Sequence, residues 1–136
     1  MFVKYLDFLR SKLTRIQPYL LWLISCWFAY RLIVNGLRKF DPEGMWTKAF
    51  ERWGYPVWFR IFIGVLETVG GILLVIPPVR HFGGLILFSV MAGALTTRLI
   101  HGTSLDDALS IATYAIVFLY LSSYFTKPNR EVEAEV

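Results

Sequence analysis

Residues 57–76 read VWFRIFIGVLETVGGILLVI, and this stretch decides the fold. Its length matches the ~20 apolar residues that an α-helix needs to cross ~30 Å of hydrocarbon. Arg60 and Glu67 are its only charged residues. In lipid, backbone N–H and C=O groups must find partners within the protein, which a helix provides locally. The stretch therefore predicts a transmembrane helix that ends before Pro77 and Pro78, because proline cannot continue a helix.

Three further segments have the same apolar character. They cover about residues 18–37, 82–100 and 105–125, and the connections on either side of the third are short, so neighbouring spans are expected to run antiparallel. With 56% hydrophobic and 18% charged residues, the chain lacks the polar outward faces of a soluble helical bundle. We predict an all-α fold, a transmembrane four-helix bundle over residues 18–126.

The segment that precedes the first span is amphipathic. Residues 1–17 place apolar side chains on one helical face and basic side chains on the other, which predicts an interfacial helix. A loosely ordered basic tail is the alternative. At the other end, residues 127–136 are polar and acidic, which predicts a disordered tail.

A short helix is also predicted between the first two spans. Asp41 is typical of a helix N-cap, and Pro42 and Glu43 of a first turn. A stop at Gly54 and Pro56 would end this helix. Two tryptophans fall within it, at positions 46 and 53, and tryptophan is enriched at membrane interfaces. We therefore expect a second interfacial helix here.

The net charge of +4 does not indicate a nucleic-acid partner, because the basic residues lie beside the apolar spans. There they favour contact with lipid headgroups and determine topology. An even number of spans leaves both termini on one side. Basic residues divide almost evenly between the two sides of the membrane, so their total does not determine the orientation of the chain. The first segment, which is basic, often dominates the orientation, and on that ground we predict that both termini are cytoplasmic. One cysteine and two histidines form no metal site of recognisable spacing, and no intrinsic cofactor is expected.

Polar and ionisable residues gather in one half of the predicted bundle. A charge near the bilayer centre costs roughly 2.5–3.5 kcal/mol, so such residues usually face protein or water. Antiparallel spans bring several of them to similar depth, while the opposite half is almost wholly apolar. The candidate ligand-binding or proton-relay residues are Arg31, Asn35, Lys39, Glu67, Arg98 and His101. No catalytic residue is identified.

Helical spacing aligns these residues in stripes. The three stripes are Arg31, Asn35 and Arg38; Arg60, Gly64, Glu67 and Gly71; and Met91, Ala94, Arg98 and His101. Small residues permit close helix approach, which favours inward-facing stripes. We expect a cavity between the spans, with Glu67 at its floor and the Trp46 and Trp53 helix as its cover.

Simpler interpretations stay open. Glu67 paired with Arg31 or Arg98 would fix helix register without any ligand. Asp106 and Asp107 fit an N-cap and a first-turn acid of the fourth span. A histidine at position 101 would lie at the interface, where solvation is its ordinary state.

Several short motifs together resemble the DoxX-like family of small four-span membrane proteins. They are NGLRKF at 35–40, WGYP at 53–56, ETVGGILLV at 67–75 followed by an arginine, and MAGA at 91–94. The likeness covers about residues 30–125. It implies a multi-pass protein of a prokaryotic cytoplasmic (inner) membrane.

The resemblance also implies a function. Some relatives belong to thiosulfate:quinone oxidoreductase, and others join membrane redox complexes, so it implies a quinone or similar lipophile as ligand and at most a membrane subunit of an oxidoreductase. Glu67, Arg98 and Lys39 would orient polar groups, and Glu67 or His101 would pass a proton. Other redox subunits are the partners implied, and a homo-oligomer stays open.

Two other functions remain. A non-enzymatic scaffold or assembly factor would use its charges for helix packing alone. A small transporter subunit ranks last, because no inverted repeat is visible in the sequence.

Overall fold

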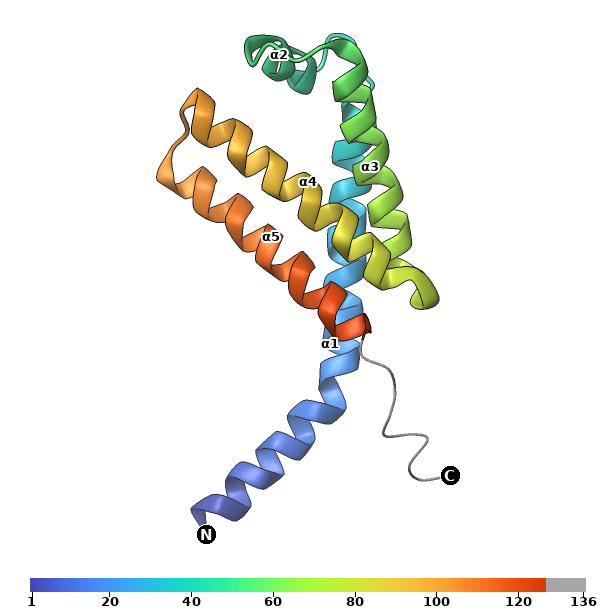
Figure 1. Ribbon diagram of the computed structural model, residues 1–136. Helices are drawn as coiled ribbons and strands as arrows, with labels where there is room; N and C mark the ends of the chain where they lie inside the picture. Colours follow the sequence, from blue (N-terminus) through green and yellow to red (C-terminus); the bar gives the residue numbers. More distant parts are fainter. Residues whose placement is uncertain (127–136) are drawn as a thin grey trace.

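The computed structural model describes residues 1–126, which are helical apart from short connections (Figure 1). In chain order the elements are α1 (Phe2–Arg38), α2 (Met45–Arg52), α3 (Val57–Val75), the 3-10 turn η1 (Pro77–Val79), α4 (Arg80–His101) and α5 (Leu105–Thr126). Among these residues, α1, α3, α4 and α5 are long and apolar enough to cross a membrane. The predicted all-α transmembrane fold is confirmed. The predicted tail at residues 127–136 lies outside the described part of the chain.

The first helix is longer than predicted. A single helix of 37 residues runs from Phe2 to Arg38, so no helix boundary separates residues 1–17 from the first span. Pro18 lies inside this helix. Proline removes one backbone hydrogen bond and bends a helix, but intact turns on either side can carry the helix through it. Figure 1 shows the N-terminal part inclined to the rest and projecting from the bundle.

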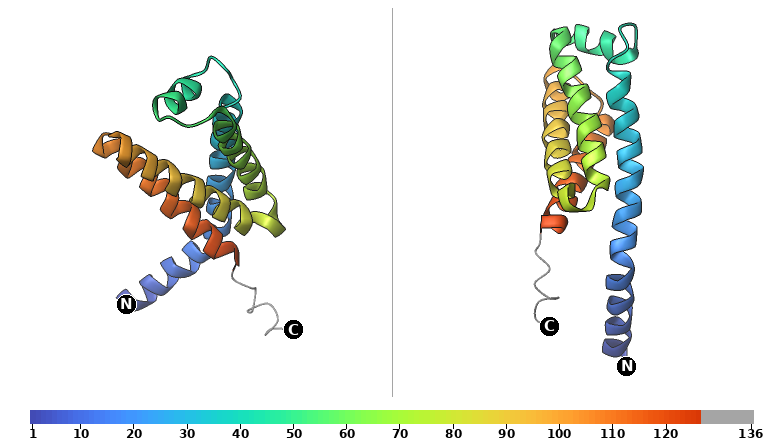
Figure 2. Two further views of the ribbon diagram at one scale, coloured as in Figure 1. Left: turned by 45° about the horizontal axis from the view of Figure 1, so that its top comes forward. Right: turned by 90° about the vertical axis from the view of Figure 1, so that its right-hand side faces the viewer.

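The four long helices form two pairs. α1 packs along α3, and α4 packs along α5, while α3 and α4 join the two pairs. The pairs are inclined to each other, so that they meet near η1 and diverge toward α2 (Figure 1). Figure 2 shows α2 lying across that divergent end. The bundle therefore has a closed end and an open end.

Glycines permit the close approach at the closed end. A Cβ on Gly83 would lie 2.7 Å from the backbone nitrogen of Leu74, and a Cβ on Gly84 would lie 3.0 Å from the Phe118 carbonyl oxygen. Leu74, Leu87 and Phe118 are completely buried there. The helices can cross at this distance only because two positions of α4 carry no side chain.

A second glycine contact sets the rotation of α1 against α3. A Cβ on Gly36 would lie 2.7 Å from the carbonyl oxygen of Gly64. This contact buries the face of α1 that carries Leu32 and Gly36. Arg31 and Arg38, at the two ends of the stripe predicted to face inward, are both exposed. That part of the prediction is wrong, because hydropathy alone does not report which face a backbone contact selects.

The short helix α2 starts later than predicted. Its N-cap is Gly44, not Asp41. The Asp41 carboxylate instead accepts the backbone N–H of Glu43 at 3.0 Å. This local bond closes a turn, a role in which aspartate competes with helix capping. The helix consequently begins at Met45, after the turn.

The end of α2 lies where the sequence predicts it. Gly54 adopts a φ of +77°, which an L side chain rarely tolerates. The N–H of Tyr55 donates to the Phe50 carbonyl at 3.0 Å, and the N–H of Gly54 donates to the Glu51 carbonyl at 3.0 Å. This pair of bonds is a Schellman motif. It ends the helix and carries Trp53 and Tyr55 to the open end of the bundle.

Candidate ligand-binding pocket

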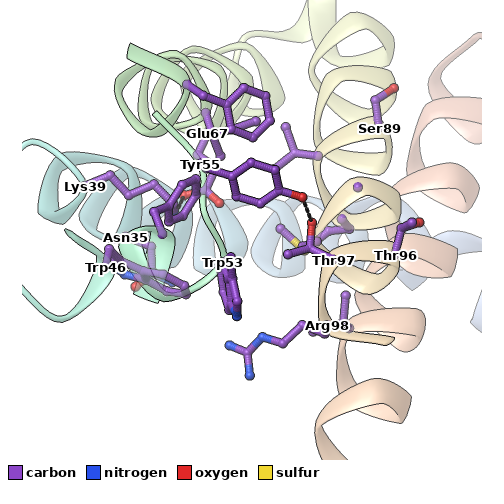
Figure 3. Close-up of a pocket in the computed structure, with 18 of the residues that line it drawn as sticks. Asn35, Lys39, Trp46, Trp53, Tyr55, Glu67, Ser89, Thr96, Thr97 and Arg98 are labelled. Atoms are coloured by element: carbon purple, nitrogen blue, oxygen red, sulfur yellow. Dashed lines mark hydrogen bonds and ion pairs between the residues drawn. The ribbon is translucent and has the colours of Figure 1, made fainter. Parts of the chain in front are cut away.

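A cavity of about 470 Å³ lies where the two helix pairs diverge. Helices α1 to α5 and the connection after α2 contribute to its wall, which is mostly apolar and aromatic (Figure 3). The apolar part includes Leu32, Phe50, Phe59, Ile63, Met91 and Ile111. The sequence predicts a cavity between the spans, with Glu67 at its floor and the Trp46 and Trp53 helix as its cover, and Glu67, Trp46 and Trp53 do line the cavity.

A buried ion pair lies in the wall of the cavity. Lys39 Nζ donates to Glu67 Oε2 at 2.7 Å, and the two side chains are only 3% and 7% exposed. Lys39 follows the last residue of α1, and Glu67 lies in the middle of α3. The Gly36–Gly64 contact brings these two backbones close enough for the side chains to meet. The pairing neutralises two charges that would be very unfavourable alone in an apolar site.

Trp46 of α2 covers the lysine of this pair. Lys39 Nζ lies 4.0 Å from the centroid of the indole ring, within the range of a cation–π contact. The indole N–H is buried and has no hydrogen-bond partner among residues 1–126. α2 therefore closes over the ion pair with an aromatic face and leaves one unused donor beside the cavity.

A second buried cation fastens the connection between α1 and α2. Arg60 is 5% exposed, and its Nη1 donates to the Asp41 carbonyl oxygen at 3.1 Å. The hydroxyl of Thr47 donates to the same oxygen at 2.6 Å. These bonds tie the connection to both α3 and α2. They hold α2, and with it Trp46, in place above Lys39.

The rim of the pocket at the open end is formed by α4 and the connection after α2. The hydroxyls of Tyr55 and Thr97 are joined by a hydrogen bond of 2.8 Å (Figure 3). The Arg98 guanidinium lies 5.6 Å from the Trp53 ring centroid, over its face. Among the described residues these contacts link the two helix pairs across the open end, where the helices themselves diverge.

Four of the six candidate residues line this pocket, namely Asn35, Lys39, Glu67 and Arg98. Lys39 and Glu67 are in direct contact. Arg98 lies at the rim and forms a longer ion pair with the exposed carboxylate of Asp107, at 3.4 Å. The partner of Glu67 is thus Lys39, and not Arg31 or Arg98.

The other two candidates lie outside the pocket wall. Arg31 is exposed on α1, with its guanidinium 5.7 Å from the Trp27 ring centroid. His101 is exposed at the end of α4, and its Nδ1 lies 2.9 Å from the Thr97 carbonyl oxygen. The structure does not bring either residue to the ion pair. A solvated position for His101 agrees with the simpler interpretation of the sequence.

Sequence reasoning did not single out Tyr55 and Trp46 as polar groups of the pocket. The signal for Tyr55 was the glycine before it, since a Schellman turn aims the next side chain back along the helix. For Trp46 the sequence suggests only a membrane-interface anchor, and its contact with the Lys39 ammonium group is visible only in the structure. Within residues 1–126, no cluster of three His, Cys, Asp or Glu side chains is arranged to hold a metal ion.

Fold and pocket define a class: a multi-pass helical membrane protein, in contact with the lipid bilayer, with a polar-ended pocket between its spans. The chain belongs to the DoxX-like family, whose model matches residues 23–122. That match reaches from α1 into α5 and confirms the resemblance seen in the motifs. Comparison with curated proteins and with solved structures gave no match to either.

Proposed function

We propose that this protein binds a lipophilic molecule with a polar head, of the quinone class, as a membrane subunit of a redox complex. The observation that carries the proposal is a buried Lys39–Glu67 pair in the wall of an apolar cavity. Small-molecule sites typically measure about 300–1,000 Å³ and combine apolar walls with a few placed polar groups. The cavity, at about 470 Å³, has both properties.

The polar groups of the pocket suit a carbonyl-bearing ring. An ammonium group has three donors, and the Glu67 contact uses one of those on Lys39, so another can donate to a ligand oxygen. Glu67 would accept or return a proton as the ring changes its protonation state. Arg98 and the Tyr55 hydroxyl, at the rim, would orient the opposite side of the ring. Electrons would come from, or pass to, a partner subunit.

The proposed setting is the cytoplasmic membrane of a prokaryote, with both termini in the cytoplasm. The DoxX-like family membership supports the membrane, and the basic residues of the first segment support the cytoplasmic termini. In that orientation α2 and the pocket rim lie toward the outer face of the membrane. Reporter fusions after residue 126 and within the 102–104 connection would give opposite signals. A reporter after residue 126 that signals from the outside would reverse the orientation.

The direct test is the quinone content of the purified protein. Protein extracted from its native membrane in mild detergent is analysed by mass spectrometry, together with Glu67→Gln and with the exposed-site control Glu51→Gln. Glu67→Gln removes the charge that neutralises and positions Lys39, the proposed donor to the ligand oxygen, so the affinity for quinone should fall about tenfold or more. The control should retain its quinone. Wild-type protein without quinone, or equal occupancy in Glu67→Gln, contradicts the proposal.

A scaffold or assembly factor is the second candidate, and one observation favours it. Lys39 and Glu67 satisfy each other, so the pair can hold α1 against α3 without any ligand. A scaffold should co-purify with a constant partner and keep that partner in the double variant Lys39→Met with Glu67→Leu, which leaves no buried charge unpaired. It should lose that partner when exposed apolar residues such as Ile72 and Ile116 are changed.

A further inference from the structure

The pocket is not sealed along its whole length. α4 contributes buried lining residues such as Met91, but also Ser89, Gly93 and Thr96, which are exposed. All of these lie within Pro77–His101, a segment long and apolar enough to cross a membrane. Gly93 has no side chain that could carry its exposed surface away from the cavity, so its exposure marks a place where the cavity reaches the outside of the bundle. The outer side of a helix of that length and hydropathy faces lipid.

The opening has defined edges. Phe59 and Ile63 line the pocket and form its α3 wall. Toward η1, the two helices close at Gly70, where side chains of α4 leave no room for a Cβ. Toward α2, the hydrogen bond between Tyr55 and Thr97 closes the gap. The result is a lateral window between α3 and α4 that is closed at both ends.

Gly93 lies at the α4 edge of this window and differs from the packing glycines. A Cβ on Gly93 would have no heavy atom within 4 Å, whereas a Cβ on Gly83 would meet backbone atoms at 2.7 and 2.8 Å. Glycine inside a helix costs about 1 kcal/mol relative to alanine. At Gly83 that cost is offset by close helix packing. At Gly93 no packing offsets it, and the empty space beside the residue is the window.

The window is apolar in character despite two hydroxyls at its edge. Ser89 Oγ donates to the Leu85 carbonyl at 2.9 Å, and Thr96 Oγ1 donates to the Ala92 carbonyl at 2.9 Å. Both donors are therefore used within α4. What remains toward the lipid is carbon surface, which suits a hydrocarbon chain and not a polar solute.

We propose that this window is a portal to the bilayer core, and that the pocket takes a ligand with a long hydrocarbon tail. The polar head lies at Lys39 and Glu67, and the tail leaves across Gly93 between α3 and α4. The inference rests on the proposed function and adds to it the route and the tail. A cavity of about 470 Å³ has room for a substituted ring but not for a long chain as well, so the chain must pass outward.

The test uses two probes and a pair of matched variants. The probes are a benzoquinone carrying a decyl tail and the same ring with a methyl group in its place. Gly93→Phe fills the window, while Ala92→Phe adds the same bulk to the neighbouring position of α4, which does not line the pocket. Binding to protein in nanodiscs is followed by quenching of tryptophan fluorescence, since Trp46 and Trp53 line the pocket.

Gly93→Phe should weaken binding of the decyl quinone about tenfold or more, because filling a tail path forces the chain or the side chain out of place. The methyl quinone should bind with an unchanged Kd, and Ala92→Phe should leave both probes unaffected. Gly93→Leu gives a second, smaller plug with the same expected selectivity, and circular dichroism confirms that each variant folds.

The outcomes separate the portal from the proposed function. Unchanged binding of the decyl quinone to Gly93→Phe, or equal weakening of both quinones, overturns the portal while leaving the quinone site intact. Failure of both quinones to bind the wild-type protein overturns the proposed function, and the portal with it.

Discussion

The closed and open ends of the bundle are built from the same two helices in opposite ways. Near η1, α3 and α4 approach until Gly83 leaves no space for a Cβ, and Leu74 and Leu87 are completely buried. Toward α2, the same helices separate and leave a cavity with a buried ion pair in its wall. The glycine contact at one end sets the angle between the pairs. The polar groups lie where that angle has opened enough space for a ligand.

Breaking the ion pair at the open end should have the largest effect on stability. Lys39→Met leaves the Glu67 carboxyl buried without its cation, which typically costs ~3–5 kcal/mol. The double variant Lys39→Met with Glu67→Leu replaces the pair by apolar groups and should recover most of that loss. Unfolding in detergent, followed by circular dichroism, measures both. Equal destabilisation of the single and double variants would contradict this account of the pair.

Overpacking the closed end should have the next largest effect. Gly83→Val places carbon atoms against backbone atoms of α3, and overpacking of this kind costs ~1–3 kcal/mol. Gly93→Val is the matched control in the same helix, because its side chain enters open space. It should shift the midpoint of thermal unfolding little. If the two variants are equally destabilised, glycine contacts do not set the angle between the helix pairs.

Removing the link across the rim should have a smaller effect. Tyr55→Phe deletes a hydroxyl bonded to Thr97, a contact worth ~0.5–1.5 kcal/mol. Thr97→Val removes the same bond from the other side, so the double variant should lose no more than either single one. Hydrogen exchange should rise in the connection after α2 and stay unchanged at the closed end. Additive losses in the double variant would show that the two hydroxyls act separately.

The smallest effect on stability and binding is expected for Arg31, a charged residue that lies outside the pocket. Arg31 is exposed, and its guanidinium lies over the Trp27 ring. Arg31→Leu should change stability by less than ~0.5 kcal/mol, as surface substitutions usually do. The Kd for the decyl quinone should stay at its wild-type value, while Glu67→Gln raises it. Loss of quinone binding in Arg31→Leu would place Arg31 in the site after all.

Local properties of the sequence were enough to predict the fold. The length and apolar character of residues 57–76 require a membrane-spanning helix whatever the neighbours are. The end of α2 followed from Gly54, whose positive φ suits a glycine. The family was visible in the order of short motifs, and the match to residues 23–122 confirms it. Local signals gave the wrong start for α2, because the Asp41 carboxylate closes a turn with Glu43 and does not cap the helix. They also gave the wrong start for the helix of the first span, because α1 continues through Pro18.

The arrangement of the site was decided by tertiary contacts. Spacing placed Lys39 and Glu67 in one half of the membrane, but a rotation of α1 by one residue would have put Arg31 in the wall instead. That rotation is selected by the contact of Gly36 with Gly64, a backbone approach between distant residues. The window at Gly93 was also decided by tertiary structure. In the sequence, a glycine beside empty space cannot be distinguished from a glycine in a tight helix crossing. Hydropathy acts residue by residue, whereas the choice of helix face depends on which two surfaces fit together.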